Sequence, residues 1–201
     1  MSSDEKNSFQ SYTTSIYIVG PSSTGKTTLC EALAKRLNLE APAYITEVAR
    51  EIIRTHGFTR ENIGMLEMQV AIMEAHLERE EEIEGRTGQI RLCDRSAVDP
   101  IVYAILTSEN DEESHKRRQI LINSPKFQHA LGGYQRSVFV LLTPIPEWLV
   151  DDGIRHMDNQ LQCLEVFRQT LKDLGICYRE LGPDMRSVAE RTAVVMGLAR
   201  I

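Results

Sequence analysis

A glycine-rich pattern near the amino terminus is the strongest chemical signal in this sequence. It begins at Gly20, continues through four variable residues, and closes with Gly25, Lys26 and Thr27, which is the spacing of a phosphate-binding loop. An apolar, β-branched run precedes it, and an amphipathic stretch follows at once. A strand before the loop and a helix after it are the context that this motif requires. The sequence therefore predicts a binding site for a nucleoside triphosphate with Mg²⁺.

Each position of the loop has a physical role in holding phosphate. The two glycines let the backbone turn sharply and point its N–H groups at an anion, and the start of the next helix adds partial positive charge. We expect Lys26 to reach the β- and γ-phosphates and the Thr27 hydroxyl to ligate Mg²⁺. The predicted nucleotide-binding residues are Gly20, Pro21, Ser22, Ser23, Thr24, Gly25, Lys26, Thr27 and Thr28.

A carboxylate at the end of a later strand could complete the metal site. Residues 89–94 read as a buried strand that ends in Asp94. In P-loop proteins an acid at this place holds Mg²⁺, or it takes a proton from an attacking hydroxyl. The alternative is a strand-end carboxylate that caps the next helix. We predict Lys26 and Asp94 as catalytic residues, and Thr27 and Asp94 as metal ligands.

Three further charged residues are candidates for the acceptor side of the site. A short predicted strand over residues 43–46 ends just before Glu47, and Arg50 lies three residues later, on the same helix face. Together with Arg95, which follows the metal-site strand, they are predicted to bind the substrate that accepts the phosphoryl group. A local ion pair between Glu47 and Arg50 is the alternative interpretation.

A charged segment, residues 151–156, follows the strand predicted over residues 137–142. Nucleotide and nucleoside kinases carry arginines on a mobile lid that closes over the transferring phosphate. Arg155 is therefore predicted as a catalytic arginine that neutralises charge in the transition state. Arg136 and Arg168 are weaker candidates for this role, and an exposed loop is the alternative interpretation of the segment.

The composition limits the class of protein. The chain has 201 residues, 42% of them hydrophobic and 26% charged, which is ordinary for a soluble globular domain. A net charge of −6 argues against a nucleic-acid surface. No apolar run reaches membrane-spanning length, and the polar N-terminus is unlike a signal peptide, so we expect a cytoplasmic protein. We predict a disordered leader over residues 1–14 and a single P-loop NTPase or kinase domain over residues 15–201.

The order of the elements predicts an α/β fold. Strands are expected at residues 15–20, 43–46, 89–94, 137–142 and 177–181, with helices between them. This alternation predicts a three-layer P-loop NTPase fold like that of nucleotide kinases, with about five mostly parallel strands flanked by helices. Residues 110–118 read as a polar loop that leads into a helix, and residues 124–131 as a short helix before two glycines. The four cysteines lack metal-ligand spacing and are expected as buried free thiols.

Four segments together resemble one known family. They are residues 20–28, residues 46–52 with the pattern Glu-x-Ala-Arg-Glu, residues 93–104 with the pattern Asp-Arg-x-x-x-Asp, and residues 151–155. These are similar to the NadR-like family of small P-loop ATPase and kinase domains, often described as an AAA domain. Its members include the ribosylnicotinamide kinase domain of a bacterial NAD-biosynthesis regulator and a eukaryotic branch described as binding GTP and phosphoinositides.

The resemblance implies ATP, or GTP, and Mg²⁺ as the bound cofactors. It implies nucleotide and metal contacts at Lys26 and Thr27, a metal-binding acid at Asp94, and an acceptor side near Glu47, Arg50 and Arg95.

The sequence leaves more than one function class open. The first is a Mg-dependent small-molecule kinase that transfers the γ-phosphoryl group of ATP to a hydroxyl of a nucleoside-like metabolite. The alternative is a nucleotide-dependent switch or NTPase with a protein or lipid partner, although the Asn-Lys-x-Asp pattern of GTPases is absent. A kinase of nucleic-acid ends would need only a small basic groove, but the acidic composition counts against it. We expect a monomer or homodimer that acts on a nucleoside triphosphate and a small acceptor.

Overall fold

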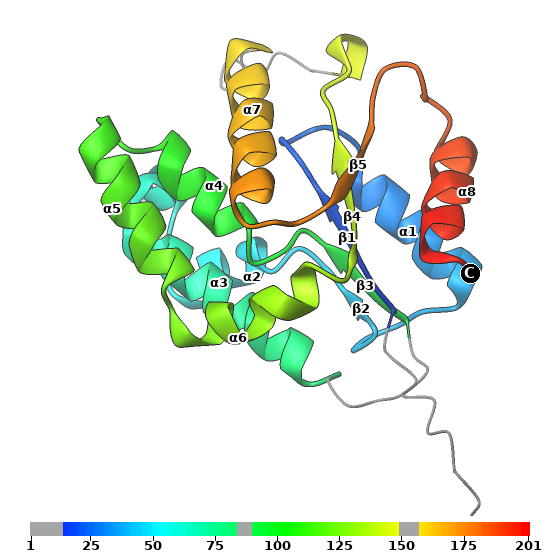
Figure 1. Ribbon diagram of the computed structural model, residues 1–201, viewed down its shortest axis with the longest axis horizontal. Coiled ribbons are helices and arrows are strands. Elements are labelled where there is room, and N and C mark those ends of the chain that lie inside the picture. The colour runs from blue at the N-terminus through cyan, green and yellow to red at the C-terminus, as the bar shows by residue number, and fades with distance from the viewer. Residues whose placement is uncertain (1–13, 84–89, 149–156) are drawn as a thin grey trace, which may run out of the picture.

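Five parallel strands form the centre of the fold (Figure 1). The computed structural model describes residues 14–83, 90–148 and 157–201. The strand order across the sheet is β2-β3-β1-β4-β5. Their bounds are Thr14–Val19 for β1, Tyr44–Ile45 for β2, Ile90–Asp94 for β3, Val138–Leu142 for β4 and Tyr178–Leu181 for β5. The predicted α/β architecture with about five parallel strands is confirmed.

Strand β1 lies in the middle of the sheet and is buried on both faces. Its residues Ile16, Tyr17, Ile18 and Val19 have no exposed surface. Successive side chains of a strand point to opposite faces, and Tyr17 and Val19 belong to one hydrophobic cluster while Ile16 and Ile18 belong to another. Burial on both faces explains why the sequence of β1 is continuously apolar and does not alternate with polar residues.

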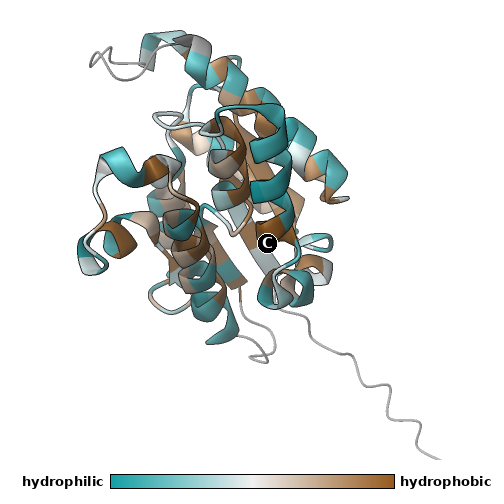
Figure 2. Cartoon of the chain, turned by 90° about the vertical axis from the view of Figure 1, so that its left-hand side faces the viewer, coloured by the Kyte–Doolittle hydropathy of each residue, from teal (hydrophilic) through white to brown (hydrophobic). Residues whose placement is uncertain are grey.

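Helices cover both faces of the sheet, which makes three layers. Helices α1 (Lys26–Leu37) and α8 (Val188–Ala199) pack on one face. The other face carries α2 (Ala49–Thr55), α3 (Leu66–Glu81), α4 (Asp99–Leu106), α6 (Pro125–Tyr134) and α7 (Met157–Asp173), with α5 (Asp111–Ile122) packed outside α4. Figure 2 shows apolar strands between helices whose outer faces are hydrophilic. No helix among the described residues is both long and apolar enough to cross a bilayer.

Two helices differ from the sequence-based expectations. Residues 110–118, expected as a polar loop that leads into a helix, already belong largely to α5. The Asn110 side chain caps that helix by accepting a hydrogen bond from the Glu113 N–H, and three acidic residues occupy its first turn. Helix α6 does not end before Gly132 and Gly133 but continues to Tyr134. Tyr134 is buried in the core, and tertiary packing of this kind outweighs the low helix propensity of glycine.

The predicted amino-terminal leader lies almost entirely outside the described residues, whereas all four cysteines lie within them. Of the predicted leader, residues 1–14, only Thr14 lies within the described residues, where it begins β1. All four cysteines are free thiols; Cys30, Cys93 and Cys163 are buried as expected, but Cys177 is exposed.

A buried carboxylate ties the sheet to two helices at the amino ends of the strands. Glu80 of α3 accepts hydrogen bonds from Tyr17 of β1 at 2.6 Å, Tyr134 of α6 at 2.8 Å and His76 at 2.9 Å. Arg91 of β3 lies 3.5 Å away and donates to the Glu80 backbone oxygen at 3.0 Å. Burial alone would raise the pKa of Glu80, but the hydrogen bond from His76 and the positive charge of Arg91 hold that pKa below its ordinary value.

We predict that Glu80→Ala destabilises the fold by about 3–5 kcal/mol, because it removes the carboxylate that these buried donors share. The free energy of unfolding from urea titration measures the effect. Glu81→Ala is the matched control, since Glu81 is the exposed neighbour on the same helix, and its effect should stay within about 0.5 kcal/mol. Equal stability of the two variants would contradict the role assigned to this network.

Candidate active site

The phosphate loop joins the carboxyl end of β1 to α1, and glycine is required where the loop begins. Gly20 has a φ of 136°, and a Cβ there would overlap the backbone oxygen of Leu142 in the adjacent strand β4. Gly25, which precedes α1, has a φ of 86°. Both conformations are rarely adopted by residues with side chains. The loop is therefore seated tightly against β4, and its shape depends on these two glycines.

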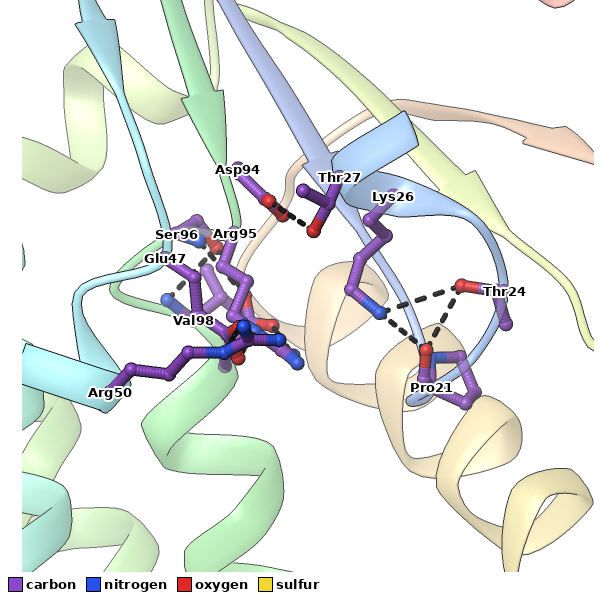
Figure 3. Close-up of polar contacts among 11 residues, drawn as sticks. Pro21, Thr24, Lys26, Thr27, Glu47, Arg50, Asp94, Arg95, Ser96 and Val98 are labelled. Carbon is purple, nitrogen blue, oxygen red and sulfur yellow. Dashed lines mark hydrogen bonds and ion pairs between the residues drawn. The ribbon is translucent and has the colours of Figure 1, made fainter. Parts of the chain in front are cut away.

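The Lys26 side chain folds back onto the loop. Its ammonium nitrogen donates a hydrogen bond to the Pro21 backbone oxygen and lies 3.5 Å from the Thr24 hydroxyl, which itself donates to Pro21 at 2.9 Å (Figure 3). The amine is thus held in the hollow of the loop, where the motif places phosphate. Lys26 is 5% exposed. Burial lowers its pKa to about 7, and the nearby charge of Arg95 acts in the same direction.

Strand pairing brings the predicted metal ligands together. Asp94 ends β3 beside Ile18 of β1, and its Oδ2 accepts a hydrogen bond from the Thr27 hydroxyl at 2.7 Å. Figure 3 shows the two side chains pointing toward each other across the space between β3 and α1. Burial raises the pKa of Asp94, against the opposing effect of the Thr27 hydrogen bond. The structure therefore places these two residues as the sequence predicted, although it does not test their roles.

The site fits a divalent cation that is bound through oxygen. The second oxygen of Asp94, Oδ1, is buried and has no hydrogen-bond partner in the part of the chain that the structure describes. The Thr27 hydroxyl lies next to it on an exposed residue. Mg²⁺ prefers one or two protein oxygens, with water and phosphate completing its shell. Thr27 and Asp94 are the residues that would hold it, and among the described residues no group of three or more His, Cys, Asp or Glu side chains forms an alternative metal site.

Arg95 forms the centre of a second charged cluster, beside the metal site. Its Nε donates to Glu47 at 2.8 Å, and its Nη1 lies 3.2 Å from Asp99. The backbone at Arg95 is in the left-handed region, with a φ of 83°, which turns the side chain toward the carboxyl end of β2. Glu47 also pairs with Arg50 at 2.8 Å, so the predicted local ion pair exists, although the Arg50 side chain is 82% exposed.

Asp99 is a site residue that the sequence-based set did not include. It is 3% exposed, and its Oδ2 accepts hydrogen bonds from the Ser96 backbone N–H at 2.9 Å and from the Ser96 hydroxyl at 3.1 Å. Asp99, not Asp94, therefore holds the turn that leads into α4. The Asp-Arg-x-x-x-Asp spacing could have revealed it, because the second aspartate lies one helical turn beyond Arg95 and within its reach.

A cavity of about 150 Å³ lies beside this cluster. Glu47, Arg95 and Tyr103 line it, and an apolar wall comes from α2 and α3, at Ile53, Met68 and Ile72. Glu47 has a lowered pKa, because the charges of Arg95 and Arg50 outweigh the effect of its burial, so it is ionised at neutral pH. The cavity thus combines a charged mouth with an apolar wall.

A second cavity, of about 420 Å³, lies on the other side of the phosphate loop. Gly25, Trp148 and Arg191 line it. The Arg191 guanidinium lies 4.9 Å from the centre of the Trp148 ring and donates to the Thr24 backbone oxygen at 3.2 Å. Sequence reasoning missed these residues, because Trp148 and Arg191 lie far from the motif in the chain. We expect this apolar groove beside the loop to receive the nucleotide base.

The arginines predicted for a lid are not brought to the phosphate loop by the described structure. Arg155 lies outside the described residues. Arg136 lines a separate cavity with Glu80 and Arg91, near the amino ends of the strands. Arg168 pairs with Glu180 of β5 at 2.6 Å, which holds it away from the loop. The structure therefore leaves a catalytic arginine as a prediction.

The sequence matches the family described as AAA domain over residues 15–191. The chain belongs to this family. No curated protein matches the sequence significantly.

Solved structures with the same fold are P-loop kinases. NadR in complex with NAD and AMP-PNP superposes with a TM-score of 0.72 and 16% sequence identity. The match covers 94% of this AAA-domain chain and 50% of NadR, so the chain spans half the length of that protein. Deoxyadenosine kinase from M. mycoides gives a TM-score of 0.62 and 12% identity over 93% of this chain and 100% of the kinase. Thymidylate kinase from Ehrlichia chaffeensis gives a TM-score of 0.59 and 15% identity, over 94% of this chain and 99% of the kinase. The predicted nucleotide-kinase-like fold is confirmed.

We predict that nucleotide affinity falls as the pH rises from 7 to 9. Lys26 has a pKa of about 7 in the free protein, and a bound phosphate favours its charged form, so binding above pH 7 takes up a proton. The dissociation constant of Mg·ADP should then rise by up to about tenfold per pH unit. Calorimetry at pH 8 in two buffers of different ionisation enthalpy should detect uptake of nearly one proton. A flat affinity between pH 7 and 9 would contradict this prediction.

We also predict that Trp148→Ala weakens Mg·ATP binding by about tenfold, because the aromatic ring supplies a stacking surface worth about 1–3 kcal/mol per base. Inorganic triphosphate with Mg²⁺ is the matched ligand, since it has no base, and its affinity should not change. Equal losses for both ligands would show that Trp148 supports the loop and does not contact the base.

Proposed function

We propose that this protein is a Mg-dependent small-molecule kinase that transfers the γ-phosphoryl group of ATP to a hydroxyl of a nucleoside-like metabolite. The observation that carries the proposal is that Asp94 links the phosphate loop to a second cavity. Its carboxylate accepts a hydrogen bond from Thr27 of the loop, and the next residue, Arg95, lines the cavity beside Glu47. A protein that only hydrolysed a nucleotide would have no need of the second cavity.

The lining of the acceptor cavity supports a nucleoside-like acceptor. Its apolar wall, which includes Met68 and Ile72, suits the flat face of a ring, while Glu47 and Arg95 suit a part that carries hydroxyl groups. Among the solved structures of similar fold, NadR was determined with NR, and deoxyadenosine kinase with dCMP. These molecules are ligands of those two proteins. Molecules of the same chemical classes are the acceptors that we would test first.

The transfer assigns a role to each group on the chain. The acceptor oxygen forms a bond to the γ-phosphorus while the bond to the β–γ bridging oxygen breaks, and ADP leaves with that electron pair. Lys26 would hold the β- and γ-phosphates. Asp94, whose pKa is raised by burial, would accept the acceptor's proton. Bound Mg²⁺ would neutralise charge on the phosphates. Glu47 and Arg95 would orient the acceptor, and we retain Arg155 as the proposed arginine that stabilises the transferring group.

We expect ADP release from Mg·ATP to rise strongly with one member of a panel of hydroxyl metabolites that includes nicotinamide riboside and deoxynucleosides. Parallel assays with Mg·GTP measure the base preference. Slow release that no acceptor stimulates would instead favour the alternative reading, a nucleotide-dependent switch or NTPase with a protein or lipid partner.

The same assay tests the two central side chains. Lys26→Ala should abolish nucleotide binding. Asp94→Asn should leave the dissociation constant of the nucleotide nearly unchanged and lower turnover by about 10²–10⁴-fold, because an amide neither takes the proton nor replaces a carboxylate ligand. Arg50→Ala is a useful comparison, since its exposed side chain should affect acceptor KM more than kcat. Normal turnover of Asp94→Asn would exclude its assigned role.

A further inference from the structure

Gln160 is a buried polar side chain in contact with the phosphate loop. It lies in the first turn of α7 and is 5% exposed. Its amide nitrogen, Nε2, donates a hydrogen bond to the Ser22 hydroxyl at 3.0 Å. Its carbonyl oxygen, Oε1, is buried and has no hydrogen-bond partner in residues 14–83, 90–148 and 157–201. Buried polar atoms in native proteins almost always have a partner, so an unpaired oxygen at a ligand site indicates a donor that arrives with the ligand.

The contact with Ser22 places this oxygen at the γ-phosphate end of the loop. Ser22 follows Pro21, whose backbone oxygen accepts a hydrogen bond from the Lys26 amine. In this motif the lysine amine reaches the β- and γ-phosphates. Gln160 therefore meets the part of the loop that is expected to surround the transferable phosphate.

The same face of α7 also lies close to the acceptor cluster. Cys163, three residues after Gln160, shares its helix face. Burial raises the pKa of the Cys163 thiol to about 12, and the charges of Asp99, Lys26 and Arg95 also act on it. Helix α7 packs directly against α4, the helix that begins at Asp99. Gln160 thus lies where the phosphate loop faces the Arg95 cluster.

The chemistry of the missing partner is restricted. The phosphates of a nucleotide carry only hydrogen-bond acceptors when ionised, so they cannot satisfy a carbonyl oxygen. A hydroxyl group can, because its O–H donates. We propose that Gln160, anchored on Ser22, orients the attacking hydroxyl by accepting its hydrogen bond at Oε1. This inference rests on the proposed phosphoryl transfer, to which it adds a residue that positions the nucleophile, a recurring part of such sites.

The amide does not take part in bond making. The hydroxyl oxygen forms the new bond to the γ-phosphorus as the bond to the bridging oxygen of ADP breaks, and the hydroxyl proton passes to Asp94. The Gln160 amide neither gains nor loses a proton, because amides do not titrate near neutral pH. Its loss should therefore affect the alignment of the nucleophile and leave the binding of the nucleotide largely intact.

The test is Gln160→Met, which keeps the length of the side chain and removes both hydrogen-bonding groups. We expect acceptor-stimulated ADP release to fall by about 10- to 100-fold, which is the scale of misalignment at a reacting group. The hydrolysis of Mg·ATP by water should fall in parallel, since water is then the nucleophile. The dissociation constant of Mg·ATP should stay within about threefold of wild type.

Gln169→Met is the matched control, because it makes the same substitution on the exposed face of the same helix, where Gln169 hydrogen-bonds to Asp173. It should behave as wild type. Ser22→Ala removes the anchor together with one predicted loop contact to the nucleotide, so it is compared at saturating Mg·ATP, where its turnover should fall less than that of Gln160→Met.

Two results would overturn the inference. The first is normal turnover of Gln160→Met, and the second is a loss explained entirely by weaker nucleotide binding; in both cases wild-type transfer remains and the proposed function stands. If the wild-type protein turns over no nucleotide with any acceptor or with water, both proposals fail together, because no nucleophile attacks the phosphate.

Discussion

A charged carboxylate with little access to water is the constraint on which the rest of the structure depends. Glu80 draws its partners from β1, β3, α3 and α6. A buried charge is tolerated only when its hydrogen bonds are complete, so these four elements must keep one mutual arrangement. Two of them are the strands whose carboxyl ends carry the phosphate loop and Asp94. The network therefore holds β1 and β3 in one alignment, and both strands carry residues of the site.

That alignment produces a site with two sides. Parallel pairing of β1 and β3 places Thr27 within hydrogen-bond distance of Asp94, and the left-handed backbone at Arg95 turns the next side chain away, toward Glu47. Adjacent residues at one strand end thus contact different parts of the site, Asp94 the phosphate loop and Arg95 the end of β2. The short distance between the two sides is a direct result of sequence adjacency, and it suits a reaction in which a group moves from one bound molecule to another.

The sequence predicted those features that depend on local order along the chain. The loop, its flanking strand and helix, and Asp94 could be found because their spacing is fixed by backbone geometry. The Trp148–Arg191 pair and the contact between Gln160 and Ser22 could not, because each joins segments more than 40 residues apart and depends on how α7 and α8 pack. The start of helix α5 was not predicted for a different reason: its polar sequence has no apolar stripe, and its start depends on the Asn110 cap.

The walls of the two cavities come from separate stretches of the chain. Among the described residues, the cavity beside Arg95 is lined by residues between Glu47 and Tyr103, most of them on α2, α3 and α4, whereas the groove beside the loop uses residues 23–29 together with Trp148 and residues of the last 20 positions. The apolar wall of the first cavity comes from α2 and α3, which carry neither Asp94 nor any residue of the phosphate loop. Substitutions on these two helices can therefore reshape that cavity during evolution while the residues around the phosphate loop stay the same.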